Sequence, residues 1–385
     1  MKISKRSDIS PFIVMDVMAA AAAREAAGER VLHLEVGQPA TPAPRAVLAA
    51  AEQALREDRI GYTVALGIPE LRECLAHYYQ TQYGVCISPE RIVVTTGSSA
   101  GFLLSFLAHF DAGDRVAICD PGYPAYRNIL KVLNLEPVLI PCRAESDFRL
   151  TVPQIAQAAK DGGLDGLLIA SPANPTGAML SPDELRAIAD YCATQNITLI
   201  SDEIYHGISY GKAAQTALAV SDDAVVINSF SKYFSMTGWR LGWMVVPQAA
   251  LRAVERIAQN LFISPPTLSQ LAAVAAFDCE AELQENVAVY ARNRGLLLRE
   301  LPKAGIDRFA PPDGAFYLYA DVSRFTDDSV RFCQDMLLQT GVAATPGTDF
   351  DVVEGHKFVR FSFAGATEVM AEAAKRLAGW LPDST

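Results

Sequence analysis

The chain has 385 residues, of which 50% are hydrophobic and 20% charged, enough to bury a large core and a second, smaller one. Its 44 acidic and 33 basic side chains give a formal net charge of −11, which disfavours nucleic acid and anionic membranes as partners. The sequence contains no apolar run of the roughly 18 residues that span a bilayer, and its start has no apolar signal core, so we expect a cytoplasmic protein.

The first 45 residues combine an alanine-rich helical stretch with the extended segment VLHLEVGQP. This pattern is typical of neither a repeat nor a linker. We expect residues 1–45 to pack against the smaller domain.

Between residues 46 and 280, short β-branched runs alternate with segments of helical periodicity. Several runs are apolar throughout, as expected of strands covered on both faces. The pattern predicts an α/β fold with a mainly parallel, seven-stranded sheet in a large domain. The seven predicted strands are Arg91–Thr96, Arg115–Cys119, Pro137–Pro141, Gly166–Ser171, Ile197–Ser201, Ala224–Phe230 and Leu241–Pro247.

From residue 281 to residue 385 the pattern changes to that of a small α+β domain. A long amphipathic helix is predicted from Glu280 to about Arg299, and two further helices over Asp327–Thr340 and Thr367–Leu381. Two shorter strands are predicted over Ala315–Asp321 and Phe358–Phe363. We expect this domain to be built from both ends of the chain.

Seven cysteines are scattered singly, with no CxxC pair, so we expect reduced thiols. The five histidines show no spacing that would bring two imidazoles onto one metal ion. A metal site is therefore not expected.

A glycine- and serine-rich motif, Thr95–Gly101, follows a predicted strand and opens an apolar helix. Backbone N–H groups and hydroxyls at such a helix start can bind phosphate. The same residues satisfy GxSxG, in which Ser99 would be the nucleophile of an α/β-hydrolase and His356 would follow in the right chain order. A simple turn is the third interpretation, and this motif alone leaves all three open.

Three more predicted strands end in polar residues. Asn174 lies in SPANPTG, where two prolines and a glycine favour a rigid turn. Asp202 ends the strand ITLIS, where a carboxylate needs a cation or hydrogen-bond donors. Lys232 follows AVVINSF among small hydroxylated residues. Open α/β sheets bind ligands at such strand ends.

Taken together, these motifs resemble those of the class I/II aminotransferases of pyridoxal-phosphate fold type I, related to aspartate aminotransferase. Their order extends over nearly the whole chain, whereas the hydrolase interpretation leaves the Asn, Asp and Lys motifs unexplained. The series consists of GQP at Gly37, the isolated Tyr62, TTGSS, DPGYP at Asp120–Pro124, SPANPTG, DEIY, SFSK with Arg240 eight residues after the lysine, and VRFSFA.

The resemblance implies pyridoxal 5′-phosphate as cofactor. Lys232 would form the Schiff base with its aldehyde and move the proton between Cα and the cofactor. Asp202 would pair with the pyridine nitrogen and keep the ring an electron acceptor. The remaining ring contacts implied are Asn174 and Tyr205 at the phenolic oxygen and Tyr123 and Ile204 on the two ring faces.

For the phosphate, the resemblance implies backbone and hydroxyl donors together with a guanidinium. The residues are Ser98, Ser99, Ser229, Ser231 and Arg240.

For the substrate, the resemblance implies Arg360 as the clamp of the α-carboxylate, beside Asn174. Gly37 would allow the N-terminal segment a close approach. Tyr62 would reach the cofactor phosphate of a second subunit, which implies a homodimer with shared sites.

The implied activity is transfer of an amino group between an L-α-amino acid and a 2-oxo acid. A carbon–sulfur β-lyase on the same fold is the alternative, and a GxSxG hydrolase and a non-catalytic regulatory domain are further ones. Thr95–Gly101 contains no basic residue, where one bacterial branch of aspartate aminotransferases has a lysine. Arg127, Arg143 or a partner residue would have to bind a substrate side-chain carboxylate. The nearby Phe12, Ile13 and Phe262 motivate the hypothesis of an apolar or aromatic amino acid.

Overall fold

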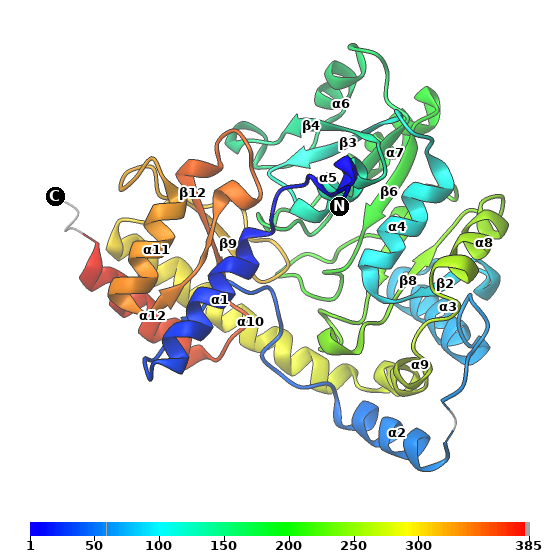
Figure 1. The fold of residues 1–385 in the computed structure, drawn as a ribbon, viewed down its shortest axis with the longest axis horizontal. Coiled ribbons are helices and arrows are strands. Elements are labelled where there is room, and N and C mark those ends of the chain that lie inside the picture. The colour runs from blue at the N-terminus through cyan, green and yellow to red at the C-terminus, as the bar shows by residue number, and fades with distance from the viewer. Residues whose placement is uncertain (59, 382–385) are drawn as a thin grey trace.

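The computed structural model describes residues 1–58 and 60–381. Seven strands form the large sheet in the order β2-β8-β7-β6-β5-β3-β4 (Figure 1). Neighbouring strands pair in parallel, except that β8 is antiparallel to both β2 and β7. The predicted mainly parallel sheet is thus confirmed. Its strands are β2 (Ile92–Thr95), β3 (Arg115–Asp120), β4 (Glu136–Pro141), β5 (Gly166–Ala170), β6 (Thr198–Asp202), β7 (Val225–Ser229) and β8 (Gly242–Val245).

The apolar runs in the central strands reflect cover on both faces of the sheet. In β5, Leu167 and Ile169 belong to one core cluster, while Leu168 between them belongs to another. The second cluster is completed by Phe102 and Phe106 of α4 (Gly97–His109). Because successive strand residues point to opposite faces, a doubly covered strand must be apolar at every position.

Helices cover this sheet on both sides (Figure 1). Besides α4, the helices of this part of the chain are α2 (Arg45–Arg56), α3 (Pro69–Tyr83), α5 (Pro124–Val132), α6 (Val152–Ala159), α7 (Pro182–Gln195), α8 (Leu251–Leu261) and α9 (Thr267–Val274).

The C-terminal part of the chain forms a second layer beside the large sheet. Its three-stranded sheet has the order β11-β12-β9 and packs with helices of the predicted positions. The strands are β9 (Tyr317–Asp321), β11 (Thr345–Pro346) and β12 (Phe358–Ser362), and the helices are α10 (Glu280–Glu300), α11 (Ser329–Thr340) and α12 (Thr367–Trp380). The two-residue strands are too short for periodicity to predict.

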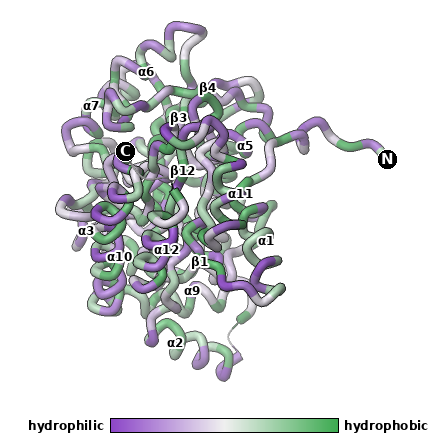
Figure 2. The backbone as a smooth tube through the Cα atoms, turned by 90° about the vertical axis from the view of Figure 1, so that its left-hand side faces the viewer, coloured by the Kyte–Doolittle hydropathy of each residue, from purple (hydrophilic) through white to green (hydrophobic). Residues whose placement is uncertain are grey.

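The N-terminal segment joins this second layer. Strand β1 (Leu32–His33) pairs in parallel with β10 (Val342–Ala343), and α1 (Ile13–Ala26) packs against α11, where Ala21 and Leu337 share one core cluster (Figure 1). Residues 1–11 are exposed. The N-terminal end points away from the body of the molecule (Figure 2), while the Asn128 side chain of α5 donates to the Ser10 carbonyl at 3.3 Å. None of the helices in the described part of the chain is both long and apolar enough to cross a membrane.

The parallel register determines where the functional side chains meet. Asp202, the last residue of β6, pairs with Ala170 of β5 and with Ile227 of β7. The carboxyl ends of these three strands are therefore adjacent. The segments that follow them carry Asn174 and Lys232 to the same edge of the sheet.

Candidate active site

A cavity of about 230 Å³ opens at the carboxyl ends of β5, β6 and β7. Large-domain strand ends, the N-terminal segment and β9 and β12 of the second layer all contribute to it. The lining residues are Phe12, Val14, Met15, Met18, Val36, Gly37, Gln38, Ser98, Ser99, Phe102, Tyr123, Tyr126, Asn174, Asp202, Ile204, Tyr205, Ser231, Lys232, Thr237, Arg240, Tyr317 and Arg360.

Lys232 lies three residues beyond the end of β7, with its ammonium group in the cavity. Its Nζ donates a hydrogen bond to the carbonyl of Gly37 and lies 5.9 Å from the centre of the Tyr205 ring. Burial, followed by the nearby charges of Arg360 and Arg240, lowers the pKa of Lys232 to about 8. A lysine with such a pKa can both accept and donate a proton near neutral pH.

Asp202 is buried at the floor of the cavity. Its carboxylate accepts hydrogen bonds from the Tyr126 hydroxyl and, at 3.0 Å, from the Ile204 N–H. It forms no salt bridge with any described residue, and burial raises its pKa to about 6. A cation placed against this carboxylate would offset part of the cost of its burial.

Arg360, on β12, is buried with its guanidinium between two aromatic rings. The centres of the Tyr317 and Phe350 rings lie 4.3 and 4.6 Å from its Cζ. Its Nη atoms donate to the Asn174 Oδ1 at 2.9 Å and to the Glu35 carbonyl, while Nε has no hydrogen-bond partner among the described residues. The guanidinium is therefore held flat, with donor capacity left for a carboxylate ligand.

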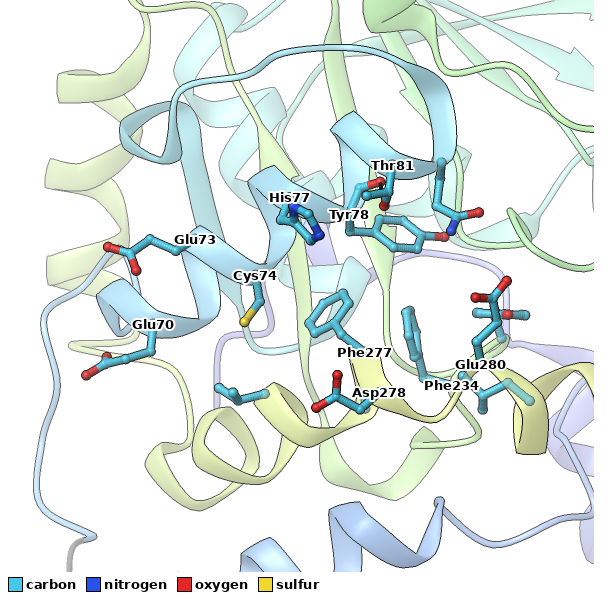
Figure 3. Close-up of a pocket in the computed structure, with 15 residues that line it drawn as sticks. Glu70, Glu73, Cys74, His77, Tyr78, Thr81, Phe234, Phe277, Asp278 and Glu280 are labelled. Atoms are coloured by element: carbon cyan, nitrogen blue, oxygen red, sulfur yellow. Dashed lines mark hydrogen bonds between the residues drawn. The ribbon is translucent and has the colours of Figure 1, made fainter.

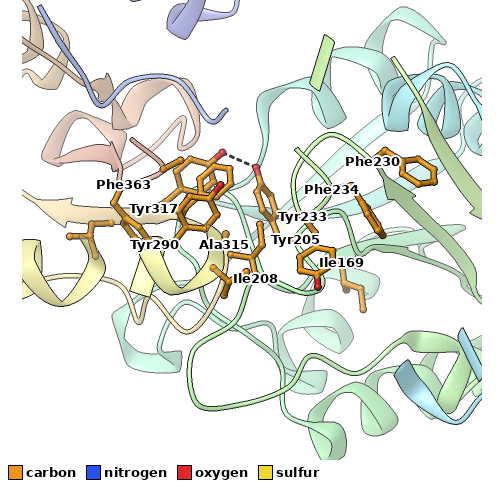
Figure 4. Packing of buried hydrophobic residues seen from close by; sticks show 14 of the residues in the cluster. Ile169, Tyr205, Ile208, Phe230, Tyr233, Phe234, Tyr290, Ala315, Tyr317 and Phe363 are labelled. Atoms are coloured by element: carbon orange, nitrogen blue, oxygen red, sulfur yellow. Dashed lines mark hydrogen bonds between the residues drawn. The ribbon is translucent and has the colours of Figure 1, made fainter. Parts of the chain in front are cut away.

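Tyr205 and Tyr317 form a buried pair between the two layers. Their hydroxyl oxygens are 2.7 Å apart (Figure 4). A side chain on Gly37 would collide with the Tyr317 hydroxyl. Glycine at position 37 thus lets the N-terminal segment run directly over this pair.

The start of α4 forms an anion-binding corner of the cavity. Ser98 and Ser99 lie in its first turn, where backbone N–H groups lack partners within the helix. A Cβ on Gly97, whose φ is +74°, would lie 2.5 Å from Nη2 of Arg240. Glycine at this position therefore lets the guanidinium approach the helix start.

A second, larger cavity of about 660 Å³ lies between α3 and the start of α10 (Figure 3). Its rim carries the carboxylates of Glu70, Glu73, Asp278 and Glu280, and the described residues that line it include no Lys or Arg. It therefore lacks the cations that a phosphate or a substrate carboxylate requires. The chemistry is concentrated in the smaller cavity.

Comparison with known proteins agrees with this geometry. The model of the family "Aminotransferase class I and II" matches residues 29–377. The chain belongs to this family.

Individual members of the family match over the whole length. A valine–pyruvate aminotransferase of Mycobacterium tuberculosis is 53% identical over 99% of both chains. The crystal structure of an aminotransferase from the same organism superposes with a TM-score of 0.97 at 52% identity, covering 99% of both chains. The aspartate aminotransferase from Thermus thermophilus with maleate superposes with a TM-score of 0.94 at 31% identity, covering 99% of this chain and 100% of the other.

The protein is accordingly an aminotransferase of fold type I, as the motif series indicates. The lyase alternative finds no support among these relatives. The hydrolase alternative fails on geometry as well, because His356 Nδ1 lies 3.1 Å from the Val353 carbonyl and the described lining of the cavity does not include this histidine.

Aminotransferases of this class use pyridoxal phosphate, and the residues present fit this group. The corner formed by α4 and Arg240 suits the phosphate. The unpaired carboxylate of Asp202 suits a protonated ring nitrogen, and Lys232 lies where an amine must meet the aldehyde. Tyr123 and Ile204 line the cavity between these points.

Two of the predicted cofactor residues lie outside the described lining of the cavity. The Ser229 hydroxyl is buried, donates to the Leu241 carbonyl at 3.0 Å and lies 2.8 Å from the Ser231 hydroxyl. Tyr62 is 84% exposed on the surface. Of the three residues that motivate the hypothesis of an apolar or aromatic substrate, Phe12 lines the cavity, whereas Ile13 and Phe262 are not among its described lining.

Sequence reasoning missed several residues that line the cavity. Tyr126, which donates to Asp202, and Tyr317, which contacts Tyr205 and Arg360, stand out among them. Tyr126 lies three residues beyond Tyr123, one helical turn along α5, and this spacing is a signal that could have found it. Met15 and Met18 carry no comparable signal.

Proposed function

We propose that this aminotransferase uses pyridoxal phosphate to move the amino group of an apolar, valine-like L-α-amino acid to a small 2-oxo acid such as pyruvate. The observation that carries the proposal is the distribution of positive charge in the cavity. Among the described lining residues, Lys232, Arg240 and Arg360 are the basic ones. In this proposal Lys232 takes part in the amino-group chemistry, Arg240 binds the cofactor phosphate and Arg360 binds the substrate α-carboxylate. None of the three is left for a second carboxylate on the substrate.

The two other arginines considered for a substrate side chain are engaged elsewhere. Arg127 donates to the Asp349 carbonyl at 2.7 Å. Arg143 forms ion pairs with Asp120 at 3.0 Å and Asp351 at 3.1 Å. Neither lies among the described residues that line the cavity. Among the described residues of one subunit, a second carboxylate on the substrate would therefore find no cation.

The part of the cavity left for the substrate side chain is apolar. It is lined by Phe12, Met15 and Met18 of the α1 region and by Val36. Methionine side chains adapt to aliphatic ligands of varied shape. The relative from Mycobacterium tuberculosis, named a valine–pyruvate aminotransferase, supports the same substrate class.

The chain's own residues have separable roles in this proposal. When bound, pyridoxal phosphate supplies an aldehyde for condensation with amines and a ring that accepts electrons. Asp202 holds the ring nitrogen protonated, and Arg360 orients the α-carboxylate. Lys232, with its lowered pKa, would take the proton from the substrate Cα and deliver it to the cofactor.

The proposal is tested by titrating the cofactor-loaded protein with single amino acids and following the absorption band of the bound cofactor. Valine, isoleucine and leucine are expected to bleach the band, and pyruvate to restore it. Aspartate and glutamate are expected to react at least about tenfold less efficiently, the scale of discrimination that an apolar pocket provides. A preference for aspartate over valine would contradict the substrate assignment.

A Met18→Lys variant sharpens this test, because it adds the cation that the apolar wall lacks. Aspartate turnover is expected to rise and valine turnover to fall, with alanine changed least. Leu338→Lys, at a position of α11 that is 64% exposed and outside the described cavity lining, is the matched control for the added charge. Equal effects of the two variants on aspartate would count against the proposed orientation of the substrate.

We also propose a homodimer with shared active sites. Tyr62 lies in a part of the chain with further exposed apolar side chains, and others follow near Ser264. These are Leu55, Ile60, Val64, Leu261 and Ile263, which are between 44% and 60% exposed. The Thr63 N–H donates to the Ser264 hydroxyl at 3.5 Å, so the loops that carry several of these residues are neighbours. Exposed apolar side chains on neighbouring loops, together with an exposed tyrosine, are typical of a protein interface.

Mixing two inactive or weakened variants tests the shared sites. Subunits with Tyr62→Phe retain Lys232, and subunits with Lys232→Ala retain Tyr62, so a mixed dimer contains one complete site. Activity is expected to rise on mixing after subunit exchange. A monomer in sedimentation, or no gain on mixing, would contradict the proposal.

The seven unpaired cysteines support the cytoplasm as the compartment, since thiols stay reduced there.

A further inference from the structure

The start of α1 is held by a side chain from the far end of the chain. The carboxylate of Asp349, in the short helix Gly347–Asp349, accepts hydrogen bonds from the N–H groups of Ile13 at 3.1 Å and Val14 at 3.3 Å. Asp349 is fully buried. The N-cap residue Phe12 makes no capping bond with its own side chain. Asp349 therefore acts as the helix cap that the local sequence does not provide.

The two ends of α1 are anchored in different ways. Near its C-terminal end, Ala21 packs with Leu337 and Ala343 of the second layer. At its start, Phe12, Val14 and Met15 line the cavity. The cap at Asp349 thus holds the end of α1 that faces the substrate.

We infer that Asp349 is a positioning residue that sets which amino-acid side chains the enzyme selects, by fixing the start of α1 over the cavity. This inference rests on the proposed function. It adds a specificity-determining residue that does not itself line the cavity.

Phe350, the next residue, explains how Asp349 can affect which lengths of substrate side chain are accepted. Phe350 stacks on the guanidinium of Arg360, with 4.6 Å between its ring centre and Cζ. Its carbonyl accepts a hydrogen bond from the N–H of Gly122 at 3.0 Å. Two consecutive residues therefore hold the carboxylate clamp and the apolar wall at a fixed separation. The space between them decides how long a side chain can be.

The test compares Asp349→Asn with Asp351→Asn in the cofactor-loaded enzyme. Asp351 is the control, because its carboxylate also accepts two backbone hydrogen bonds within the same loop, from Val353 at 2.9 Å and Glu354 at 2.8 Å. It pairs with Arg143 at 3.1 Å as well, so Asp351→Asn disturbs at least as many local contacts as Asp349→Asn while leaving the cap of α1 in place. In Asp349→Asn, kcat/KM is expected to fall about tenfold for valine and less than about twofold for alanine, whose methyl group is too short to reach α1. Asp351→Asn should leave the ratio of kcat/KM for valine to kcat/KM for alanine unchanged.

A second variant attacks the same contact from α1. Ile13→Pro removes one N–H that Asp349 accepts, and proline is well tolerated at the first position of a helix. It should lower the valine-to-alanine ratio in the same direction, by about threefold. If Asp349→Asn does not fold, this variant decides. Equal losses for both amino acids in the variants, or no loss, would overturn the inference.

Hydrogen exchange separates this inference from the proposed function. Amides in the first two turns of α1 should exchange faster in Asp349→Asn than in the parent or in Asp351→Asn. If the parent uses no apolar amino acid, the proposed function fails, while the exchange still tests whether Asp349 holds α1. If the parent prefers valine and the exchange is unchanged, the positioning role fails alone.

Discussion

The two ends of the active-site cavity are built on different principles. At the cofactor end, Asp202 ends one strand and Lys232 follows the adjacent strand of the same sheet, whose register brings them together. At the substrate end, the wall comes from α1, and the loop that holds it lies more than 300 positions away. The first arrangement depends on local chain geometry, and the second on tertiary packing. We therefore expect the chemistry to depend on the end built from one sheet, and the selectivity on the end that is assembled from distant segments.

The largest effect is expected at the cofactor end. Replacing Lys232 by alanine removes the proton-transferring amine, and transamination should fall by about 10⁴-fold or more. Steady-state turnover with valine and pyruvate measures this. Lys212→Ala removes a lysine that is 67% exposed and pairs only loosely with Asp313 at 3.7 Å, and it should keep full activity. Comparable losses in both variants would remove Lys232 from the mechanism.

Loss of Arg360, which binds the substrate α-carboxylate between the cofactor end and the substrate end, should give the next largest effect. Arg360→Ala leaves a substrate carboxylate without its buried partner, at a cost of about 2–5 kcal/mol. KM should rise at least about 30-fold for every amino acid tested, whatever its side chain. Arg308→Ala, at a position that is 62% exposed, is the control. An unchanged KM would place the α-carboxylate elsewhere.

The buried charge of Lys232 should be measurable in the cofactor-free protein. With a folded pKa of about 8 against 10.5, protonated Lys232 destabilises the fold. Lys232→Met should therefore be more stable than the parent by about 2 kcal/mol at pH 7, after allowance for partial exposure. Between pH 8 and 10.5 the unfolded parent binds the extra proton, so parent stability rises and the difference shrinks. Urea unfolding at several pH values measures it, and a difference that is independent of pH would contradict the lowered pKa.

The smallest effect is expected for the hydroxyl that joins the two layers. Tyr317→Phe removes the hydrogen bond to Tyr205, worth about 0.5–1.5 kcal/mol, and should lower kcat about two- to tenfold. Tyr319→Phe is the matched control on the same strand, because its buried hydroxyl has no hydrogen-bond partner in the described structure. Kinetics with valine compare the two. If Tyr319→Phe lowers kcat as much as Tyr317→Phe, the effect comes from packing.

The sequence predicts the cofactor end well for a physical reason. Each motif there follows a strand, and parallel strands align their ends, so Asn174, Asp202 and Lys232 can be placed together without coordinates. The sheet and the helices of the second layer were likewise predictable from periodicity. The division of the chain at residues 45 and 280 stays a prediction.

The substrate end was not predictable in the same way. Asp349 caps a helix whose sequence shows no cap, and the partner it needs is 336 residues away. Met15 and Met18 look like any apolar residues on a helix. Such contacts depend on how two layers meet, which neither propensity nor spacing encodes.

The pairing of β1 with β10 has a consequence for biosynthesis. The carbonyl of Glu35 accepts a hydrogen bond from Thr345, 310 residues later in the chain. At translation rates of 5–20 residues per second, the N-terminal segment waits about 15–60 seconds for its partner to be made. During that time the apolar side of α1 is exposed in the nascent protein. The active site is therefore completed only when translation is nearly finished, and the first helix made is among the last to dock.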